Sequence, residues 1–214
     1  MGKKITALKL QARNRARVNV FLDGRFAFGL AKLEAARLRL GQELSEADIA
    51  RLQAADAREQ VHARALQYLA RRPRSEGEIR QHLQKHKVTE ADIEQEIERL
   101  RQSGLVDDQA FARLWVENRA AFRPRSQRAL RAELKRKGVS ADVTKAALAA
   151  ADDAASAEQL ALRRASRLAG LPRPEFRRKL GDFLARRGFD YDTVKAAVDK
   201  AWQSRPGAAE AADE

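Results

Sequence analysis

The chain has 214 residues, of which 43 are Lys or Arg and 30 are Asp or Glu, so its formal net charge is +13. This charge favours a polyanion, an acidic protein surface, or both as the binding partner. The chain contains no cysteine, which excludes disulfides, thiolate zinc sites and cysteine nucleophiles. It also has no apolar run as long as a membrane span or a signal-peptide core, so we expect a cytoplasmic protein without membrane contact. The positive charge favours association with the nucleoid.

Residues 1–56 predict a small antiparallel sheet followed by short helices. Apolar side chains alternate on both sides of Asp23-Gly24, namely Val18, Val20 and Leu22 before it and Phe26, Phe28 and Leu30 after it. Because both residues of an Asp-Gly pair tolerate positive φ, the pattern predicts a β-hairpin. Gly24 to Gly29 has the spacing of a phosphate-binding loop, but Leu30-Ala31 stand where Lys and Ser or Thr are required. Ser45 with Asp48 predicts a helix N-cap.

From residue 57 onward the pattern is helical and repeats about every 50 residues. Leu83, Leu134 and Leu184 lie 51 and 50 residues apart. Other positions then align, namely Ile79 with Leu130 and Leu180, and Lys87 with Gly138 and Gly188 at helix ends. The period predicts tandem three-helix repeats at 57–106, 107–153 and 154–203 that stack into an elongated, curved array. Residues 204–214 lose the periodicity and predict a disordered tail.

The stretch from Gly104 to Val139 is the most informative part of the chain. Its first helix places four apolar side chains on one side, Phe111, Leu114, Trp115 and Phe122. Its second helix, after Pro124, places four cations on one face, Arg125, Arg128, Arg131 and Lys135. Leu130 and Leu134 lie on the opposite face. The pattern therefore predicts one packed face and one cationic stripe.

Basic side chains are the candidate binding residues, and they are distributed over the repeats. The predicted DNA- or protein-binding set is Arg72, Arg74, Arg119, Arg123, Arg125, Arg128, Arg131, Lys135, Arg136, Lys137, Arg178 and Arg186. Solvated helix faces are the alternative interpretation. The stripe in the second repeat favours binding, because it lacks the interleaved acids that form ion pairs along a helix.

Phe122 has two interpretations. It lies between Arg119 and Arg123, where it would stack on a nucleotide base. Its helical phase with Phe111 and Trp115 instead favours packing in the core, and we take core packing as the expectation.

Catalytic and metal-binding patterns are weak. His82 and His86 have the spacing of two metal ligands on a helix, but Lys85 and Lys87 crowd them and no third ligand is evident. Asp107-Asp108 predict a helix start with N-capping rather than a metal site. No nucleophile, base and orienting group occur in a supporting pattern, so we expect neither an enzyme nor a bound cofactor or metal.

Several motifs in order resemble the RecX family of regulatory proteins. Gly104-Leu105-Val106-Asp107-Asp108, Phe111-Ala112-Arg113, Leu130 with Leu134, and Lys137-Gly138-Val139 resemble the central repeat of that family. Arg71 to Leu83 is similar to the first repeat and Phe183 to Phe189 to the third, so the resemblance covers residues 57–203. It implies a mainly structural role for the motif residues Gly104, Leu105, Asp107, Asp108, Phe111, Ala112, Leu130, Leu134 and Gly138.

The resemblance also implies a function. RecX proteins modulate the RecA recombinase, usually as inhibitors that lodge in the groove of the RecA filament on DNA and limit its growth, its ATPase activity and strand exchange. The implied partners are the RecA filament and single- or double-stranded DNA, the implied processes are recombination, DNA repair and the SOS response, and we expect a monomer. The alternatives are a general DNA-binding protein and a transcriptional regulator that uses a helix-turn-helix unit.

Overall fold

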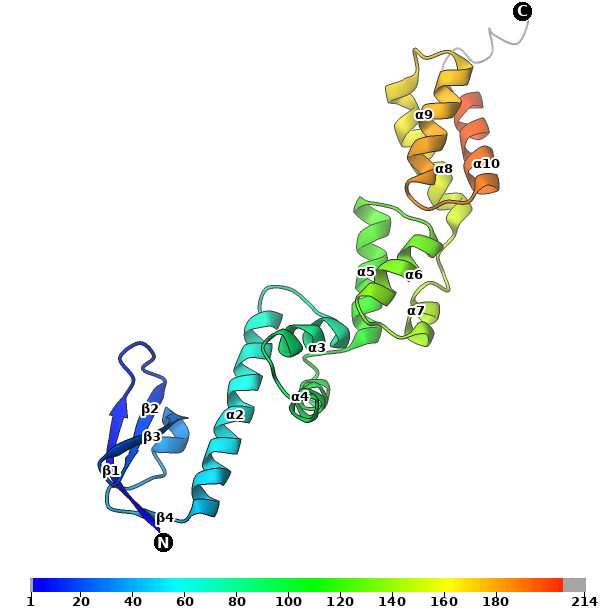
Figure 1. Cartoon of the computed structure of the whole chain (residues 1–214). Helices are drawn as coiled ribbons and strands as arrows, with labels where there is room; N and C mark the ends of the chain where they lie inside the picture. Colours follow the sequence, from blue (N-terminus) through cyan, green and yellow to red (C-terminus); the bar gives the residue numbers. More distant parts are fainter. Residues whose placement is uncertain (1, 206–214) are drawn as a thin grey trace, which may run out of the picture. The chain divides into compact units, whose positions relative to one another are not determined.

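The computed structural model describes residues 2–205 of the chain, and Figure 1 labels its helices and strands. The chain forms two compact units, one of Met1–Pro73 with Ile79–Leu105 and the other of Arg74–Glu78 with Val106–Glu214. The predicted disordered tail lies outside the described residues from residue 206 onward. None of the described helices is both long and apolar enough to cross a membrane.

Four short strands and ten α-helices make up the described residues. The strands are β1 (Lys3–Leu10), β2 (Arg17–Leu22), β3 (Arg25–Ala31) and β4 (Glu43–Leu44). The helices up to the middle of the chain are α1 (Lys32–Ala35), α2 (Glu46–Leu69), α3 (Glu76–Lys85), α4 (Glu90–Gln102), α5 (Asp108–Phe122) and α6 (Gln127–Arg136). The remaining helices are α7 (Ala141–Ala147), α8 (Asp153–Ala165), the 3₁₀ turn η1 (Ser166–Leu168), α9 (Arg173–Ala185) and α10 (Tyr191–Gln203).

The N-terminal sheet is antiparallel with the strand order β3-β2-β1-β4. Asp23 and Gly24, with φ angles of 47° and 81°, connect β2 to β3 and confirm the predicted hairpin. One face of the sheet is apolar and packs on α2, with the buried side chains Ile5, Val18, Val20, Leu22, Phe28, Leu30, Leu44 and Ile49. Phe26 is not part of this core: it is 59% exposed, and its ring lies edge-on to that of Phe21 at 6.0 Å.

A buried carboxylate fixes α2 to the sheet. Asp56 is 5% exposed and accepts two hydrogen bonds from the Arg17 guanidinium, at 3.1 and 2.7 Å, and one from the Ala31 backbone N–H at 3.0 Å. At its start, α2 has a capping box in which the Ser45 hydroxyl and the Asp48 carboxylate cap each other's backbone N–H, as the sequence predicts. The helix continues without a break through the expected division at residues 56 and 57, so it serves both the sheet and the first three-helix repeat.

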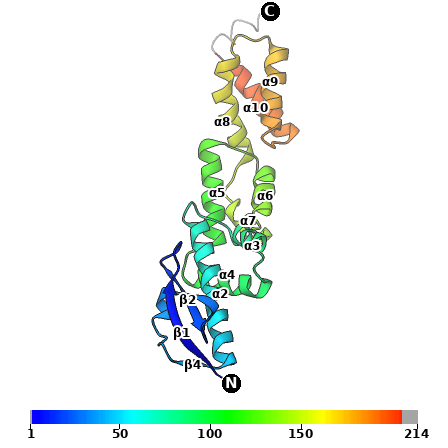
Figure 2. The same cartoon turned by 60° about the vertical axis from the view of Figure 1, so that its left-hand side comes forward.

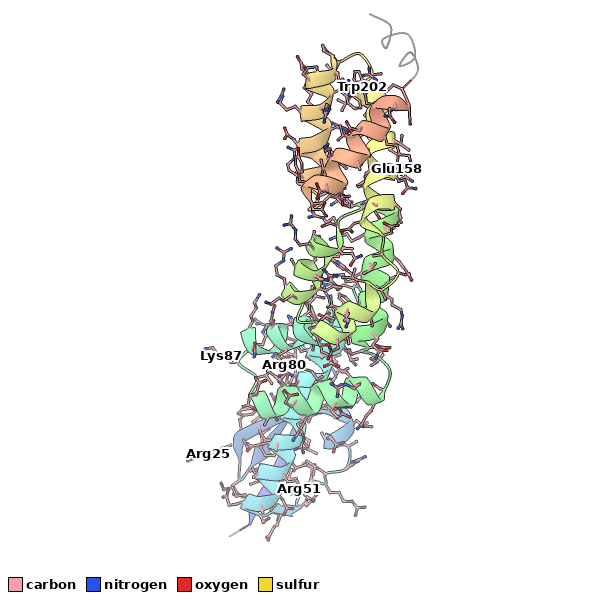
Figure 3. All side chains as sticks on the ribbon, turned by 90° about the vertical axis from the view of Figure 1, so that its right-hand side faces the viewer. Arg25, Arg51, Arg80, Lys87, Glu158 and Trp202 are labelled. Carbon is pink, nitrogen blue, oxygen red and sulfur yellow. The ribbon has the colours of Figure 1, made fainter. Side chains whose placement is uncertain are left out.

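The three-helix repeats have the predicted register. The aligned apolar side chains are all buried, namely Ile79 and Leu83 in α3, Leu130 and Leu134 in α6, and Leu180 and Leu184 in α9. In both views of Figures 1 and 2, α8, α9 and α10 lie side by side, and their core contains Leu160, Phe176 and Val198. Trp202, labelled in Figure 3, closes this core with its ring 5.1 Å from that of Phe176.

The second helix of each repeat ends in the left-handed conformation. Gly138 and Gly188 have φ angles of 77° and 94°, which glycine adopts without a steric penalty. Lys87 stands at the same position of the first repeat with a φ of 60°, and its side chain extends away from the ribbon in Figure 3. The aligned helix ends are therefore confirmed, although the first repeat uses a residue with a Cβ.

Serine hydroxyls link neighbouring second helices within the second compact unit. Ser126 is buried before α6, and its hydroxyl donates a hydrogen bond to the Gly188 carbonyl at 2.7 Å. One repeat earlier, the buried Ser75 donates in the same way to the Lys137 carbonyl. Gly77 follows Ser75 in this contact, and a Cβ at Gly77 would lie 2.5 Å from the Lys137 carbonyl oxygen. The backbones approach so closely here that only glycine fits.

The two aspartates at the start of α5 have different roles. Asp107 is the N-cap, and its carboxylate accepts from the backbone N–H groups of Gln109 and Ala110 at 2.8 and 3.0 Å. Asp108 accepts instead from the backbone N–H of Glu76, the first residue of α3, at 2.9 Å. The predicted capping is thus correct for both, but the second aspartate caps the helix of a neighbouring repeat.

The same pair of aspartates occurs again at Asp152-Asp153, which the sequence reasoning missed. Asp152 is the N-cap of α8, and Asp153 accepts from the backbone N–H of Gln127 at 2.7 Å. A search for Asp-Asp at the start of each repeat finds both pairs. The connection between repeats is therefore encoded in short polar motifs as well as in apolar positions.

Candidate polyanion-binding surface

A buried carboxylate in α6 holds two of the predicted binding arginines. Glu133 is 7% exposed and accepts hydrogen bonds from Trp115 Nε1 and Arg119 Nε, both at 2.8 Å. Arg125 Nε lies 3.0 Å from its other carboxylate oxygen. Burial acts to raise the pKa of Glu133, but the hydrogen bonds from Arg119 and Trp115 and the charges of Arg119 and Arg125 outweigh it, so the pKa is lowered. Both arginines therefore have a structural task.

Lys137 and Arg74 are likewise engaged in packing. The Lys137 ammonium lies 2.9 Å from a Glu78 carboxylate oxygen and 4.2 Å from the centre of the Trp115 ring. Only 16% of its side chain is exposed. Arg74 lies at the limit of ion-pair distance from the same carboxylate, 4.0 Å away, with 12% of its side chain exposed. Lys137 thus ties the end of α6 to the start of α3, and Arg74 adds a second cation beside the same carboxylate.

The other predicted cations face solvent. Among residues 2–205, no carboxylate lies within ion-pair distance of Arg123, Arg128, Arg131, Lys135, Arg136, Arg178 or Arg186, all of which are exposed. Arg72 is also exposed and donates to the Pro73 carbonyl at 2.9 Å. Arg128 Nη2 donates to the Gly188 carbonyl at 3.2 Å and Arg131 Nη2 to Gln127 Oε1 at 2.8 Å. A guanidinium has five N–H donors, so these two side chains keep donors for a phosphate or a carboxylate.

The cationic stripe is shorter than the sequence suggests. Because Ser126 is the N-cap of α6, Arg125 precedes the helix and turns back to Glu133. Arg128, Arg131 and Lys135 remain as the exposed stripe of α6. The prediction that Arg125 belongs to the same helical face was therefore wrong, because the helix starts two residues later.

Equivalent positions in α9 repeat part of this surface. The register that aligns Leu134 with Leu184 also aligns Arg128 with Arg178 and Arg136 with Arg186. The second helices of both repeats in the second compact unit thus present exposed arginines at matching positions.

A group of three arginines, which sequence reasoning missed as a group, lies between α5 and the end of α9. Arg187 donates a hydrogen bond from Nη1 to the Pro124 carbonyl at 3.1 Å, and its guanidinium lies 4.9 Å from the centre of the Phe183 ring. Burial lowers the pKa of Arg187, and the positive charges of Arg125 and Arg123 lower it further. We call Arg123, Arg125 and Arg187 the junction arginines. Arg187 matches Lys137 in the repeat register, and this is the signal that would have identified it.

Phe122 does not lie in the core. It is 77% exposed at the last position of α5, and Leu114 is 50% exposed on the same helix, so both predicted core positions were wrong. Phe111 is buried and Trp115 packs against the same core. The apolar stripe ends there because Arg119 occupies the next turn, with its guanidinium 4.3 Å from the centre of the Trp115 ring.

Other candidate sites have structural explanations. His82 stacks on Tyr68 with ring centres 4.0 Å apart, and the His86 ring lies edge-on at 4.8 Å. In the part of the chain that the structure describes, no group of three or more His, Cys, Asp or Glu side chains is arranged to hold a metal ion.

Four domain families match the chain in order. They are the RecX N-terminal domain at residues 3–45 and the first, second and third three-helix domains of RecX at residues 62–100, 107–148 and 151–198. The resemblance seen in the sequence motifs is thereby confirmed.

Proteins named regulatory protein RecX are similar to this chain in sequence. The protein of Thermobifida fusca (strain YX) is 42% identical over 95 residues, which are 43% of this chain and 51% of that protein, so the match spans about half of its length. The protein of Prosthecochloris aestuarii (strain DSM 271 / SK 413) is 37% identical over 103 residues, covering 48% of this chain and 68% of that protein.

Two crystal structures share the fold. That of a regulatory protein RecX is 29% identical with a TM-score of 0.68, and the match covers 92% of this chain and 99% of that one. That of RecX from Lactobacillus salivarius is 22% identical with a TM-score of 0.60 and covers 69% and 97%, which is a likeness of fold alone.

Proposed function

Because the chain belongs to the RecX family of regulatory proteins, we propose that it binds RecA filaments on DNA and inhibits their growth. RecA ATPase activity and strand exchange fall as a consequence. The protein acts as a regulator without chemistry of its own, which fits the name of its relatives. It works as a monomer associated with the nucleoid. Its domains are the N-terminal segment 1–56 and the three-helix repeats at 57–106, 107–153 and 154–203.

The exposed cations of α6 and α9 are the observation that carries this proposal. They lie at matching positions of consecutive repeats, where they are free to engage phosphates of the filament DNA, acidic side chains of the recombinase, or both. Many weak contacts on one chain give avidity without a deep pocket. A filament that repeats its own surface suits a ligand that is itself built of repeats.

The experiment is a DNA-dependent RecA ATPase and strand-exchange assay with this protein added well below the recombinase concentration. We expect inhibition at such ratios, because blocking a filament end affects all the subunits that would have joined it. DNA is kept in excess, so that simple competition for DNA does not mimic inhibition. Unchanged ATPase and strand-exchange rates contradict the proposal.

A general DNA-binding protein is the second candidate, favoured by the net charge of +13. Such a protein binds DNA with an affinity that falls steeply with salt, and it affects RecA only when DNA is limiting. A transcriptional regulator differs from both, because it prefers one operator strongly over random DNA. Competition with random and genomic fragments, run beside the ATPase assay, separates the three.

A further inference from the structure

Phe122 is a large apolar side chain placed in solvent beside a cationic group. A single exposed phenylalanine has no meaning by itself, since surface apolar residues are common. Its position is informative here, because Arg123 follows it directly and is exposed without a carboxylate partner among the described residues. The ring is 77% exposed, so one of its faces is accessible to a ligand.

The backbone that presents Phe122 is held in place. Pro124 is buried, and its carbonyl accepts the hydrogen bond from Arg187 at 3.1 Å. The backbone N–H of Ser126 donates to the Arg187 carbonyl at 3.1 Å. These contacts fix the turn between α5 and α6 against the end of α9, so the exposed Phe122 and Arg123 lie on a preorganised segment beside Arg187.

The junction arginines are poorly neutralised. Glu133 faces Arg125, but it is shared with Arg119, and Arg123 and Arg187 have no ion pair within residues 2–205. The lowered pKa of Arg187 reflects its burial and the neighbouring charges of Arg125 and Arg123. An anion bound here would relieve that repulsion, and guanidinium groups match the geometry of phosphate oxygens.

We propose that Phe122 and the junction arginines form a binding site for single-stranded nucleic acid, in which a base stacks on the Phe122 ring and the adjoining phosphate binds Arg123 and Arg187. The ring offers a π-face that accepts any base, so the site is independent of sequence. A duplex cannot use the ring in this way, because its bases are stacked on one another. This inference rests on the proposed function in one respect, namely that the strand bound in the cell is the DNA of a RecA filament. Binding of a free strand does not depend on RecA.

The first test measures the affinity of the full chain for a fluorescent oligothymidylate without any recombinase. Phe122→Ala should weaken binding about fivefold or more, the lower end of what one base–aromatic stack contributes. Phe122→Trp should retain the affinity, because it keeps an aromatic face. Leu114→Ala is the matched control, since Leu114 is 50% exposed on the same helix but outside the site, and it should bind like the unmodified chain.

The second test separates stacking from phosphate contact. A strand of the same length with abasic residues keeps its phosphates, so Phe122→Ala should not change its binding. Arg123→Gln should weaken both strands and reduce the slope of log affinity against log salt by about 0.7. Arg113→Gln removes a charge from the body of α5 and serves as its control. No part of the site reads a 2′-hydroxyl, so an RNA strand should bind within about twofold of DNA.

Several outcomes overturn the inference. They are a Phe122→Ala affinity within twofold of the unmodified chain, an equal loss on the abasic strand or on duplex DNA, and a strong preference between DNA and RNA. Loss of RecA inhibition in Phe122→Ala with oligonucleotide binding intact also overturns it, because Phe122 would then contact the recombinase. The proposed function fails separately, when the unmodified chain does not inhibit RecA.

Discussion

The second helices of the first and second repeats share an apolar register but differ in how their charges are used. In α3 there are two cations and two carboxylates, and Arg80 pairs with Glu90 and, at 2.7 Å, with Glu94 of the neighbouring α4. In α6 there are four cations and one carboxylate, Glu133, which is buried. Arg80 is thus neutralised within the first repeat, whereas Arg128, Arg131, Lys135 and Arg136 of the second repeat have no carboxylate within ion-pair distance among residues 2–205.

The position before the leucine that recurs in each repeat differs among the three repeats. It is His82 in α3, Glu133 in α6 and Phe183 in α9. His82 stacks on Tyr68, Glu133 collects arginines as a carboxylate, and Phe183 lies under the guanidinium groups of Arg164 and Arg187 at 5.4 and 4.9 Å. The leucine is buried in the core of each repeat. The residue before it differs, and it therefore changes which nearby side chains are held in contacts within the chain.

Removal of the buried carboxylate is expected to have the largest effect. Glu133→Ala leaves Arg119 and Trp115 without their acceptor, and we expect the free energy of unfolding to fall by about 3 kcal/mol. His82→Ala at the equivalent position removes a ring stack and should cost about 1 kcal/mol. Urea denaturation followed by circular dichroism measures both. Equal losses in the two variants would show that the repeats do not differ as described.

The stabilisation that Glu133 contributes should depend on pH, which gives a second test of its role. Its pKa is lowered in the folded chain from the usual 4.5, so its stabilising contribution is fully present above that value. The contribution is lost as the pH falls from about 4.5 through the lowered folded value. We therefore expect the difference in unfolding free energy between the unmodified chain and Glu133→Gln to be constant from pH 7 to pH 5 and to shrink below pH 4.5. A difference that grows with acidity contradicts the assignment.

Charge reversal in the second repeat tests whether the exposed cationic stripe of α6 binds DNA. Replacement of Arg128, Arg131 and Lys135 by Glu should weaken binding to single-stranded DNA on the order of a hundredfold at 0.1 M salt and flatten the salt slope by about 2. Arg80→Gln in the first repeat should change the affinity less than threefold, because its charge is already neutralised by Glu90 and Glu94. Circular dichroism checks the fold. A comparable loss in Arg80→Gln would mean that both helices contact DNA.

The helix ends provide a comparison of backbone strain. Gly138 has a φ of 77°, and a Cβ there would lie 2.7 Å from the Gly77 Cα. Gly138→Ala should therefore destabilise the chain by about 2 kcal/mol. Thermal and urea unfolding measure the loss. An unchanged midpoint would show that the backbones of these two segments separate at little cost.

The equivalent position in the first repeat gives the smallest expected effect, with the opposite sign. Lys87 holds a φ of 60°, a conformation that costs a residue with a Cβ more than it costs glycine. Lys87→Gly should stabilise the chain by about 0.5 kcal/mol, because relief of this strain slightly exceeds the entropy that glycine adds to the unfolded chain. A loss of stability would place the Lys87 side chain in a contact that outweighs the strain.

Local patterns predicted the fold well. The Asp23-Gly24 hairpin and the Ser45 cap depend on residues a few positions apart, and the register of Leu83, Leu134 and Leu184 depends on a period that is visible along the chain. Such signals are readable because hairpin turns, caps and helix faces are formed by neighbours in the chain. The motifs also identified the family, since their order along the chain is itself a sequence property.

The candidate site was predicted less well, because the environment of each cation depends on distant residues. Arg119 and Arg125 meet Glu133, Lys137 meets Glu78 59 residues earlier, and Arg187 meets Pro124 63 residues earlier. Helical phase placed Phe122 in the core, but the core ends at Trp115 and Val116, about two turns before Phe122.

The sequence by itself determined the positive charge, the repeat of buried leucines and the helix caps, because each is local or additive along the chain. Only the tertiary structure decided which cations form ion pairs with carboxylates of the same chain and which face solvent. It also left Phe122 and Arg123 exposed to solvent and brought Arg187 to the turn that follows them. Charge pairing depends on distance in space, and residues separated by tens of positions become neighbours only when the helices pack.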